Sequence, residues 1–315
     1  MPSSSVRTFT DPDQYAAAMR RANVALTVMQ RGIFNSRICR IDLHHLWMQR
    51  FSADLGWTSY IDYLGGPDVV FTFQTRPGPN MMRYGRECPY DSLTRLNSAH
   101  GYFLHSPGPA SYGTVSVPLD EITALAPAPN KRAPTSSEDY MILTPASSAI
   151  GRLRRLHGAA CDLAGDAPAV LAQPEAARGL EQALIEAVIH CLDSGERQED
   201  RAAQRQHAAI MRRFHRVVEE HLGEPLYISE LCREVGASER TLNVCCHEHL
   251  GMGPKHFLLL RRMHMVRRAL SEANAGETTI TDIATRYGFW QFGRLAVEYK
   301  ALFGEAPSAT LARSP

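Results

Sequence analysis

Apolar residues alternate with polar ones over short runs in the N-terminal half of the chain and recur every three or four positions towards the C-terminus. The first pattern predicts β-strands and the second predicts amphipathic helices. Within the helical part, residues 226–250 and 279–304 repeat one design, a short helix, a turn containing glycine and a longer helix. The residues expected to face inward on the two short helices are Ile228, Leu231, Val235, Ile280, Ile283 and Tyr287.

The ends of these helices carry residues with suitable side chains or backbone freedom. Ser229 and Thr281 stand where N-caps are expected, and Gly236 and Gly288 follow the apolar runs, where a positive φ often ends a helix. Two helices joined by such a turn form a helix-turn-helix, whose second helix enters the major groove of DNA. The second helices are expected to begin at Ser238 and Gln291 and to bury Leu242, Cys246, Leu250, Leu295, Tyr299 and Phe303.

One long basic helix is predicted to join the two repeats, over residues 253–270. Pro254 suits its first turn. At about 1.5 Å per residue this helix spans roughly 25 Å. It can therefore hold two recognition helices about one turn of DNA apart, which is near 34 Å along the duplex. Its apolar stripe consists of Phe257, Leu260, Met263, Val266 and Leu270.

The two repeats and their connector resemble the DNA-binding domain of the AraC/XylS family of bacterial transcription regulators. The segments that carry the resemblance are 231–242, 251–257, Arg261, 283–289 and 299–307. The resemblance implies a cytoplasmic regulator that binds promoter or operator DNA as a homodimer, responds to a small-molecule effector and acts on RNA polymerase. It implies no enzymatic activity, no cofactor and no membrane partner.

The outer face of the first recognition helix supplies the candidate base-reading residues. Aligned with the family motif, Arg240, Asn243 and Val244 fall on positions that read bases, and His247 lies near one that contacts the DNA backbone. Asn can pair with adenine through two hydrogen bonds, and Arg can pair with the O6 and N7 atoms of guanine. Thr241, on the same helix, is included in the expected DNA surface. The alternative is a polar face that only meets solvent.

The second recognition helix carries a different set of outward residues. Many members of the family have Arg where this chain has Val297, which weakens the case for base reading by this helix. We expect Arg294 and Lys300 to contact phosphates instead. The residues expected on this surface are Gln291, Phe292, Arg294, Val297, Glu298 and Lys300.

Four arginines of the connector have two possible roles. Arg261, Arg262, Arg267 and Arg268 are candidates for phosphate contacts, although a solvated charged face is an equal alternative for most of them. Arg261 matches an arginine typical of the family. It is placed among the DNA-binding candidates, with a structural ion pair as its alternative.

The N-terminal part is predicted to be rich in strands separated by turns with Gly and Pro. Many short strands of this kind favour a small barrel or a sandwich, so the fold class is α+β. The family resemblance implies a cupin-like β-barrel that binds the effector. Trp47, Tyr84 and Tyr102 are candidate lining residues. The predicted strands are 24–29, 36–43, 46–51, 59–63, 69–73, 94–96, 101–104 and 112–117.

Helices and a linker are predicted between the two parts of the chain. A helix is expected over residues 150–163 after a poorly patterned loop over 119–149, and a second helix over 174–192 is expected to support dimerisation. Residues 194–206 are polar and resemble a linker. The predicted division is an effector-binding domain over 1–165, a dimerisation helix and linker over 166–206, and a DNA-binding domain over 207–315.

Amino-acid composition excludes few classes of fold or function for this chain. The 315 residues suffice for two domains, and the contents of 44% hydrophobic and 21% charged residues are those of ordinary globular proteins. The net charge of +1 favours a protein that binds a specific site over one that coats DNA. The seven cysteines show no zinc-binding spacing. The N-terminus lacks the apolar core of a signal peptide.

Three alternative chemistries receive little support from the sequence. His44 and His45 are adjacent on a predicted strand, so they would point to opposite faces and could not bind one metal ion. Cys246 is expected to be a buried packing residue, and Cys245 is expected to be partly exposed near DNA. A cupin-type enzyme fused to a DNA-binding domain is the rival function, although the histidine spacing of metal-binding cupins is missing.

Overall fold

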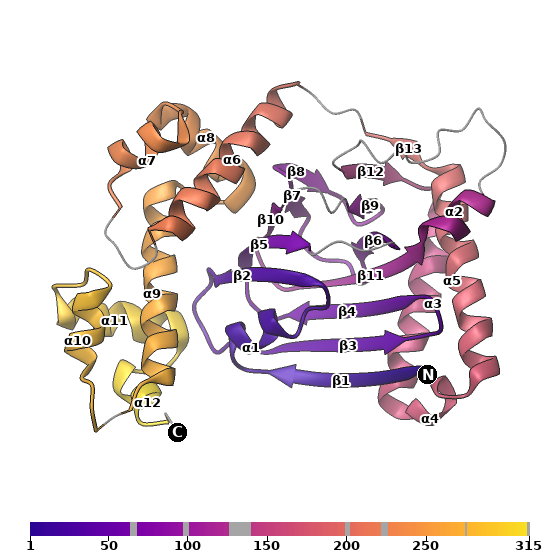
Figure 1. Ribbon diagram of the computed structural model, residues 1–315, viewed down its shortest axis with the longest axis horizontal. Helices are drawn as coiled ribbons and strands as arrows, with labels where there is room; N and C mark the ends of the chain where they lie inside the picture. Colours follow the sequence, from indigo (N-terminus) through magenta and orange to yellow (C-terminus); the bar gives the residue numbers. More distant parts are fainter. Residues whose placement is uncertain are drawn as a thin grey trace.

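The computed structural model describes residues 1–63, 68–96, 101–125, 140–198, 202–221, 226–274 and 276–313. It has an N-terminal part rich in β-sheet and a C-terminal part made of helices, as Figure 1 shows. The coarse α+β prediction is therefore confirmed. The described strands lie in two separate sheets, and a closed barrel is not seen in them.

The larger sheet has eight described strands, and each pairs antiparallel with its neighbour. One face of this sheet is apolar and the other is largely polar or aromatic, because side chains alternate along each strand. In spatial order the strands are β1 (Ser3–Phe9), β3 (Ser36–Asp42), β4 (Trp47–Ala53), β11 (Ala110–Pro118), β6 (Asp68–Gln74), β9 (Leu93–Leu96), β12 (Tyr140–Thr144) and β13 (Glu196–Arg197).

The smaller sheet has five described strands, again antiparallel. It packs on the larger sheet through buried aromatic residues that include Trp57, Tyr102 and Tyr112. Helix α1 (Pro12–Ala17) closes one end of this core, and Asp11 caps it by accepting a hydrogen bond from Asp13 N at 2.9 Å. In spatial order the strands are β2 (Ala22–Val28), β5 (Trp57–Tyr63), β10 (Tyr102–Ser106), β7 (Met81–Arg83) and β8 (Arg86–Cys88).

Helices cover the apolar face of the larger sheet. α3 (Ser147–Asp166) and α5 (Pro174–Ser194) lie side by side on it, with α4 (Pro168–Leu171) between them in the chain and α2 (Leu119–Leu125) nearby. The face predicted for α5 is buried in this core, at Ala177, Leu184, Val188 and Cys191, with Leu180 partly buried. Because this apolar face is used within the chain, any dimer contact of α5 must involve its outward side.

His44 and His45 lie in the turn between β3 and β4, and not on a strand as expected. Their backbone amides both donate to Oε2 of Glu181 on α5, at 2.9 Å. The carboxylate of Glu181 is buried and holds this turn against the helix. The packing of this turn against α5 therefore accounts for the position of His44 and His45.

The C-terminal part of the structure consists of helices. They follow one another around the long helix α9, which is seen at the left of Figure 1. Helix α6 begins at Ala202, ahead of the expected boundary at 207. The helices are α6 (Ala202–Glu220), α7 (Ile228–Val235), α8 (Glu239–Leu250), α9 (Pro254–Glu272), α10 (Ile280–Arg286), α11 (Phe292–Phe303) and α12 (Pro307–Leu311).

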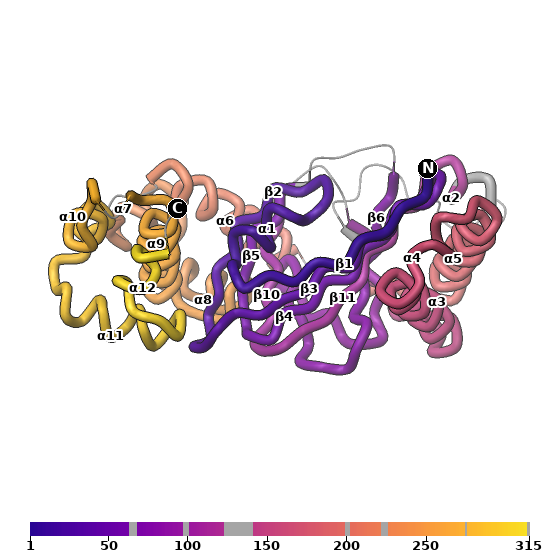
Figure 2. Tube along the Cα trace, turned by 90° about the horizontal axis from the view of Figure 1, so that it is seen from below, coloured from indigo at the N-terminus to yellow at the C-terminus, as the bar shows by residue number. Residues whose placement is uncertain are grey.

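The C-terminal helices pack on the outer face of the five-stranded sheet, so the layers follow one another along the molecule (Figure 2). Phe103 of β10 enters the helical core and lies 6.3 Å from Phe257 between ring centroids. Tyr60 of β5 stacks on His215 of α6 at 3.4 Å between ring centroids. These rings come from both parts of the chain, so the contact between the parts is a continuous apolar core.

Polar contacts fix the same interface at its edge. Nε2 of His264 on α9 lies 3.1 Å from both N and O of Val28 at the end of β2. The guanidinium of Arg267 donates to Asp11 Oδ2 at 2.9 Å, so Asp11 caps α1 and binds α9 at once. None of these contacts was expected from the sequence, because the partners are more than two hundred residues apart.

Most predicted elements are confirmed, but several strands were not predicted. All eight predicted strands are present within a few residues of their expected bounds. The short strands β7, β8 and β13 were missed. Strand β1 was also missed, and β12 lies inside the stretch expected to be a loop over 119–149. Both β1 and β12 pair with other strands of the larger sheet. This pairing stabilises them as strands, although their own sequences do not predict it. In the part that the structure describes, none of the helices is long and apolar enough to cross a membrane.

The buried histidine of α9 makes stability depend on pH. The pKa of His264 is lowered to about 4, chiefly because the ring is buried; the Val28 hydrogen bond and Asp13 raise it, and the charges of Arg267 and Arg261 lower it. Because the folded pKa lies below the unfolded value of about 6.5, the neutral form is favoured in the fold. Its contribution is full above pH 6.5 and is lost as the pH falls towards 4.

We therefore expect the free energy of unfolding, measured by urea titration, to fall between pH 7 and pH 5. His264→Gln keeps a donor and an acceptor for Val28 and should make this slope shallower. The buried His157, His215 and His249, whose pKa values burial also lowers, should account for the slope that remains. His190→Gln, on the exposed side of α5, is the matched control and should leave the slope unchanged. An unchanged slope in His264→Gln would show that this histidine does not carry the pH dependence.

Candidate nucleic-acid interface

The first helix-turn-helix is formed by α7 and α8. Gly236 ends α7 with φ of 69°, in the left-handed region that glycine adopts without strain. Ser238 caps α8 as predicted, because its Oγ accepts a hydrogen bond from Thr241 N at 3.1 Å. The N-cap prediction for α7 was wrong, since the helix begins at Ile228 and Tyr227 occupies the cap position.

The outer face of α8 is open. Arg240, Asn243, Val244 and His247 are all exposed, while Leu242, Cys246 and Leu250 are buried in the helical core. Thr241 is half-buried, and its hydroxyl lies 2.9 Å from Ser238 Oγ. Its side chain therefore contacts the N-cap residue of α8. The helix thus presents one amide, one guanidinium and one imidazole to whatever approaches this face.

The second helix-turn-helix is formed by α10 and α11. Thr279 caps α10, and Asp282 N donates to its Oγ1 at 3.1 Å, while the Asp282 carboxylate accepts from Thr279 N. The cap expected at Thr281 is therefore wrong by two residues, because the chain turns earlier. Gln291 does stand at the N-cap of α11, although its side chain makes no capping hydrogen bond.

The outward residues of α11 lie as predicted, with one modification. Gln291, Phe292, Val297 and Lys300 are exposed, and Val297 is 70% exposed despite its apolar side chain. Arg294 donates to Glu298 Oε1 at 2.7 Å within the same helix, so this guanidinium is already paired. Leu295 and Tyr299 are buried, whereas Phe303 is only partly buried beneath α9.

The connector α9 sets the distance between the two recognition helices. At about 1.5 Å per residue its 19 residues extend roughly 28 Å. Its predicted apolar stripe, from Phe257 to Leu270, is buried. In Figure 2, α8 and α11 lie towards one edge of the helical part while α7 and α10 lie towards the other. This arrangement suits two successive major grooves on one side of a duplex.

The arginines of α9 point mostly towards other parts of the protein. Arg261 forms an ion pair with Glu219 of α6, and only 14% of its side chain is exposed. Arg268 pairs with Asp13 and Arg267 with Asp11. The guanidinium of Arg262 lies over the ring of Phe289 at 5.2 Å. The geometry therefore favours the structural alternative for Arg261 over a contact with DNA.

Both cysteines of α8 are buried. Cys246 is inward as predicted, but the expectation that Cys245 is partly exposed was wrong, since its side chain also has no solvent exposure. Burial raises the pKa of Cys245 to about 11 and raises that of Cys246 further. A thiol of this kind is a poor nucleophile at neutral pH.

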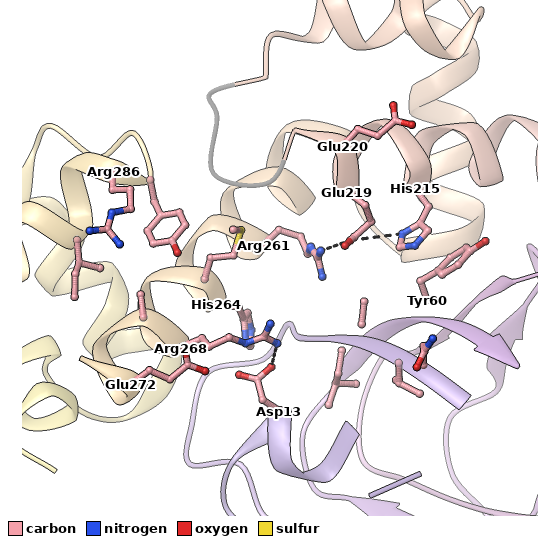
Figure 3. A pocket seen from close by; sticks show the side chains of 18 of the residues that line it. Asp13, Tyr60, His215, Glu219, Glu220, Arg261, His264, Arg268, Glu272 and Arg286 are labelled. Carbon is pink, nitrogen blue, oxygen red and sulfur yellow. Dashed lines mark hydrogen bonds and ion pairs between the residues drawn. The ribbon is translucent and has the colours of Figure 1, made fainter. Parts of the chain in front are cut away.

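A cleft of about 1050 Å³ lies between the helices and the five-stranded sheet (Figure 3). Tyr60 and Asp13 line it from the N-terminal part, and Glu219, Arg261 and Arg268 line it from α6 and α9. The labelled charges face one another across this space, and the dashed contacts join Arg261 to Glu219 and Arg268 to Asp13. The charges of these two arginines are thus already balanced.

The aromatic residues expected to line an effector site lie elsewhere, between the two sheets. Tyr84 and Tyr102 stack at 4.5 Å between ring centroids, and both are buried. Trp47 is buried too, and its Nε1 donates to Asp68 Oδ2 at 3.3 Å. Sequence reasoning missed Arg83, which lies beside Tyr102 in the same interior. Its position before a tight turn gave no sign that it would be buried.

Residues 231–313 match a family model described as "Helix-turn-helix domain". The matched residues contain α8, α9, α10, α11 and α12 with the last five residues of α7. The C-terminal part of the chain is thus similar to helix-turn-helix domains. The candidate base-reading residues Arg240 and Asn243 lie on the exposed face of α8, inside the matched residues.

Curated relatives are similar to about a third of the chain. The "Probable thc operon regulatory protein" of Rhodococcus erythropolis is 39% identical over 98 residues, which cover 31% of this chain and 30% of the relative. The "XylDLEGF operon transcriptional activator 1" of Pseudomonas putida is 37% identical over 103 residues, which cover 32% and 31%. The similarity thus spans about a third of each relative's length.

A solved structure of "the AraC-like transcriptional activator CuxR" aligns with 90% of this chain and 100% of that chain, at 14% identity and a TM-score of 0.43. A structure of ToxT from Vibrio cholerae aligns with 94% of this chain and 98% of that one, at 11% identity and a TM-score of 0.29. Similarity at this level does not establish a shared fold for the N-terminal part.

The ion pair of Arg261 can be separated from DNA binding by substitution. Arg261→Gln removes a buried charge-assisted hydrogen bond, so we expect it to lower the free energy of unfolding by about 2 kcal/mol. It should leave the salt dependence of DNA binding unchanged, because no phosphate contact is lost. Arg216→Gln removes the exposed ion pair with Glu220 on α6. It should lower the free energy of unfolding by less than about 0.5 kcal/mol. A change of about one in the salt slope for Arg261→Gln would instead place Arg261 on DNA.

Proposed function

We propose that this protein is a sequence-specific DNA-binding transcription regulator whose activity is controlled by a small molecule bound in the N-terminal domain. The observation that carries the proposal is the pair of open recognition faces, on α8 and α11, held towards one edge by α9. The named relatives, an operon regulatory protein and an operon transcriptional activator, support the same conclusion.

The two recognition helices have unequal roles in this proposal. Asn243 and Arg240 on α8 supply hydrogen bonds that distinguish bases in the major groove. On α11, Val297 supplies none and Arg294 is paired with Glu298. Lys300, which is exposed near the end of α11, then contributes mainly a phosphate contact.

The proposal extends to the remaining parts of the chain. Residues 1–165 act as the effector domain, 166–206 as the dimerisation helix and linker, and 207–315 as the DNA-binding domain. Two antiparallel sheets packed face to face support a cupin-like description of the first domain. The regulator acts on RNA polymerase at its operator as a homodimer. Regulators of this family are generally not enzymes, and we assign none of these residues to catalysis.

Substitutions on the two recognition helices should have different consequences. Asn243→Ala or Arg240→Ala should cost about 1–3 kcal/mol of binding energy and relax preference at one or two base pairs. Lys300→Ala should weaken all sequences alike and reduce the slope of log K against log salt by about one. The measurement is fluorescence anisotropy with the operator and with random DNA at several salt concentrations.

The difference between the α8 variants and Lys300→Ala decides which residues read bases. A single loss of affinity would not, because partial unfolding of any variant also lowers its affinity for DNA. Each variant must therefore melt at the wild-type temperature before it is compared. Arg233→Ala removes an exposed charge from α7 and is a matched control that should leave base preference intact. If Asn243→Ala weakens operator and random DNA equally, α8 does not read bases and the roles proposed here are wrong.

A further inference from the structure

Both recognition helices carry a valine at the same position of their outer faces. In α8 the N-cap is Ser238, and Val244 lies six residues later. In α11 the N-cap is Gln291, and Val297 again lies six residues later. Although both side chains are apolar, 42% of Val244 and 70% of Val297 are exposed. The repeat therefore places one apolar group at the same point of each surface that we assign to DNA.

Val297 points away from the body of the protein. Leu295 and Tyr299, two positions before and two positions after it, are buried in the helical core. Two positions correspond to about 200° around an α-helix, so Val297 lies on the opposite side of α11 from both. An apolar side chain in water is unfavourable, and contact with another apolar group removes that free-energy cost. The exposed position of Val297 is therefore suited to an apolar group of a binding partner.

The residue one helical turn before Val297 leaves open space beside it. This residue is Gly293, and residues four apart are neighbours on a helix surface. A Cβ atom placed on Gly293 would meet no atom within 4 Å, and its φ is not in the left-handed region, so the fold itself does not require glycine here. Glycine also weakens a helix relative to alanine. Its presence allows a group of methyl size to lie against Val297.

The charged residues near Val297 are suited to other tasks than base selection. Arg294 donates to Glu298 within α11 at 2.7 Å, so its guanidinium already has an acceptor. Lys300 is exposed and ends in a compact ammonium group, which suits a phosphate. Base edges in the major groove present hydrogen-bonding groups and one apolar group, the C5 methyl of thymine. Among the four bases, thymine therefore matches an exposed valine best.

We propose that Val244 and Val297 each contact the C5 methyl of a thymine, so that the two helices select thymines about one turn of DNA, or roughly 10 base pairs, apart. On α8 this contact adds to the hydrogen bonds of Arg240 and Asn243. On α11 it is the main source of base selection. The inference rests on the proposed function, because it requires both helices to enter successive major grooves.

The test uses the full chain and a duplex that it enriches from a pool of random sequences. Each thymine of this duplex is replaced singly by deoxyuridine, which removes only the methyl group, and the dissociation constant is measured by fluorescence anisotropy. Two replacements, about one turn of DNA apart, should each weaken binding roughly fourfold, as expected for one buried methyl group. Val297→Ala should remove most of one effect and Val244→Ala most of the other, because the methyl group then loses its partner.

The controls separate a methyl contact from a general loss of binding. Both alanine variants should stay folded, because the valines are exposed and alanine favours helices more than valine does. Val170→Ala removes an exposed valine from α4 and should retain both deoxyuridine effects. At each sensitive position, a C·G pair with 5-methylcytosine should bind more tightly than one with cytosine, because its methyl group occupies the same place in the major groove.

The possible failures are distinguishable. If the full chain enriches no sequence, the proposed function is wrong and this inference falls with it. If a sequence is enriched but all of its deoxyuridine variants bind as tightly as the parent duplex, the inference alone is wrong, and Val297 is left to contact another protein. The inference also fails if every deoxyuridine effect persists in Val297→Ala, because the methyl groups then have partners other than the valine of α11.

Discussion

The packing of the C-terminal helices on the outer face of the five-stranded sheet is the constraint on which the remaining geometry depends. Phe103 lies within the helical core, and Tyr60 stacks on His215, so two parts of the chain share one buried surface. This contact uses the inner sides of α6, α8 and α9. It leaves the outer faces of α8 and α11 open, which is the condition for reading DNA.

The cleft between the two parts and the space between the sheets differ in how their charges are paired. In the cleft, Arg268 of α9 pairs with Asp13 of α1, and Arg261 of α9 pairs with Glu219 of α6. Between the sheets, Nη2 of Arg83 donates to Thr72 Oγ1 at 3.3 Å. The charge of Arg268 therefore helps to hold α9 against the N-terminal part. The hairpin after Arg83 joins the two regions through Gly85 and His249.

Local patterns in the sequence predicted the local parts of this structure. The apolar stripe of α9, the glycine at 236 and the cap at Ser238 depend on neighbours a few residues away, and all are confirmed. The caps expected at Ser229 and Thr281 were displaced by two residues because both helices begin earlier, after Tyr227 and Thr279. Contacts such as His264 with Val28 join residues that are 236 positions apart. Neither periodicity nor spacing in one sequence carries information about such pairs, so the interface and the burial of Arg83 were not predicted.

The docking of the two parts can be tested most directly by a double-mutant cycle on Tyr60 and His215. The free energy of unfolding is measured for wild type, Tyr60→Ala, His215→Ala and the double variant. Because the two rings come from different parts of the chain, they can interact only if the parts are docked in solution. The structure predicts a coupling energy of about 1 kcal/mol for this stacked pair. A coupling energy of zero would contradict the docked arrangement.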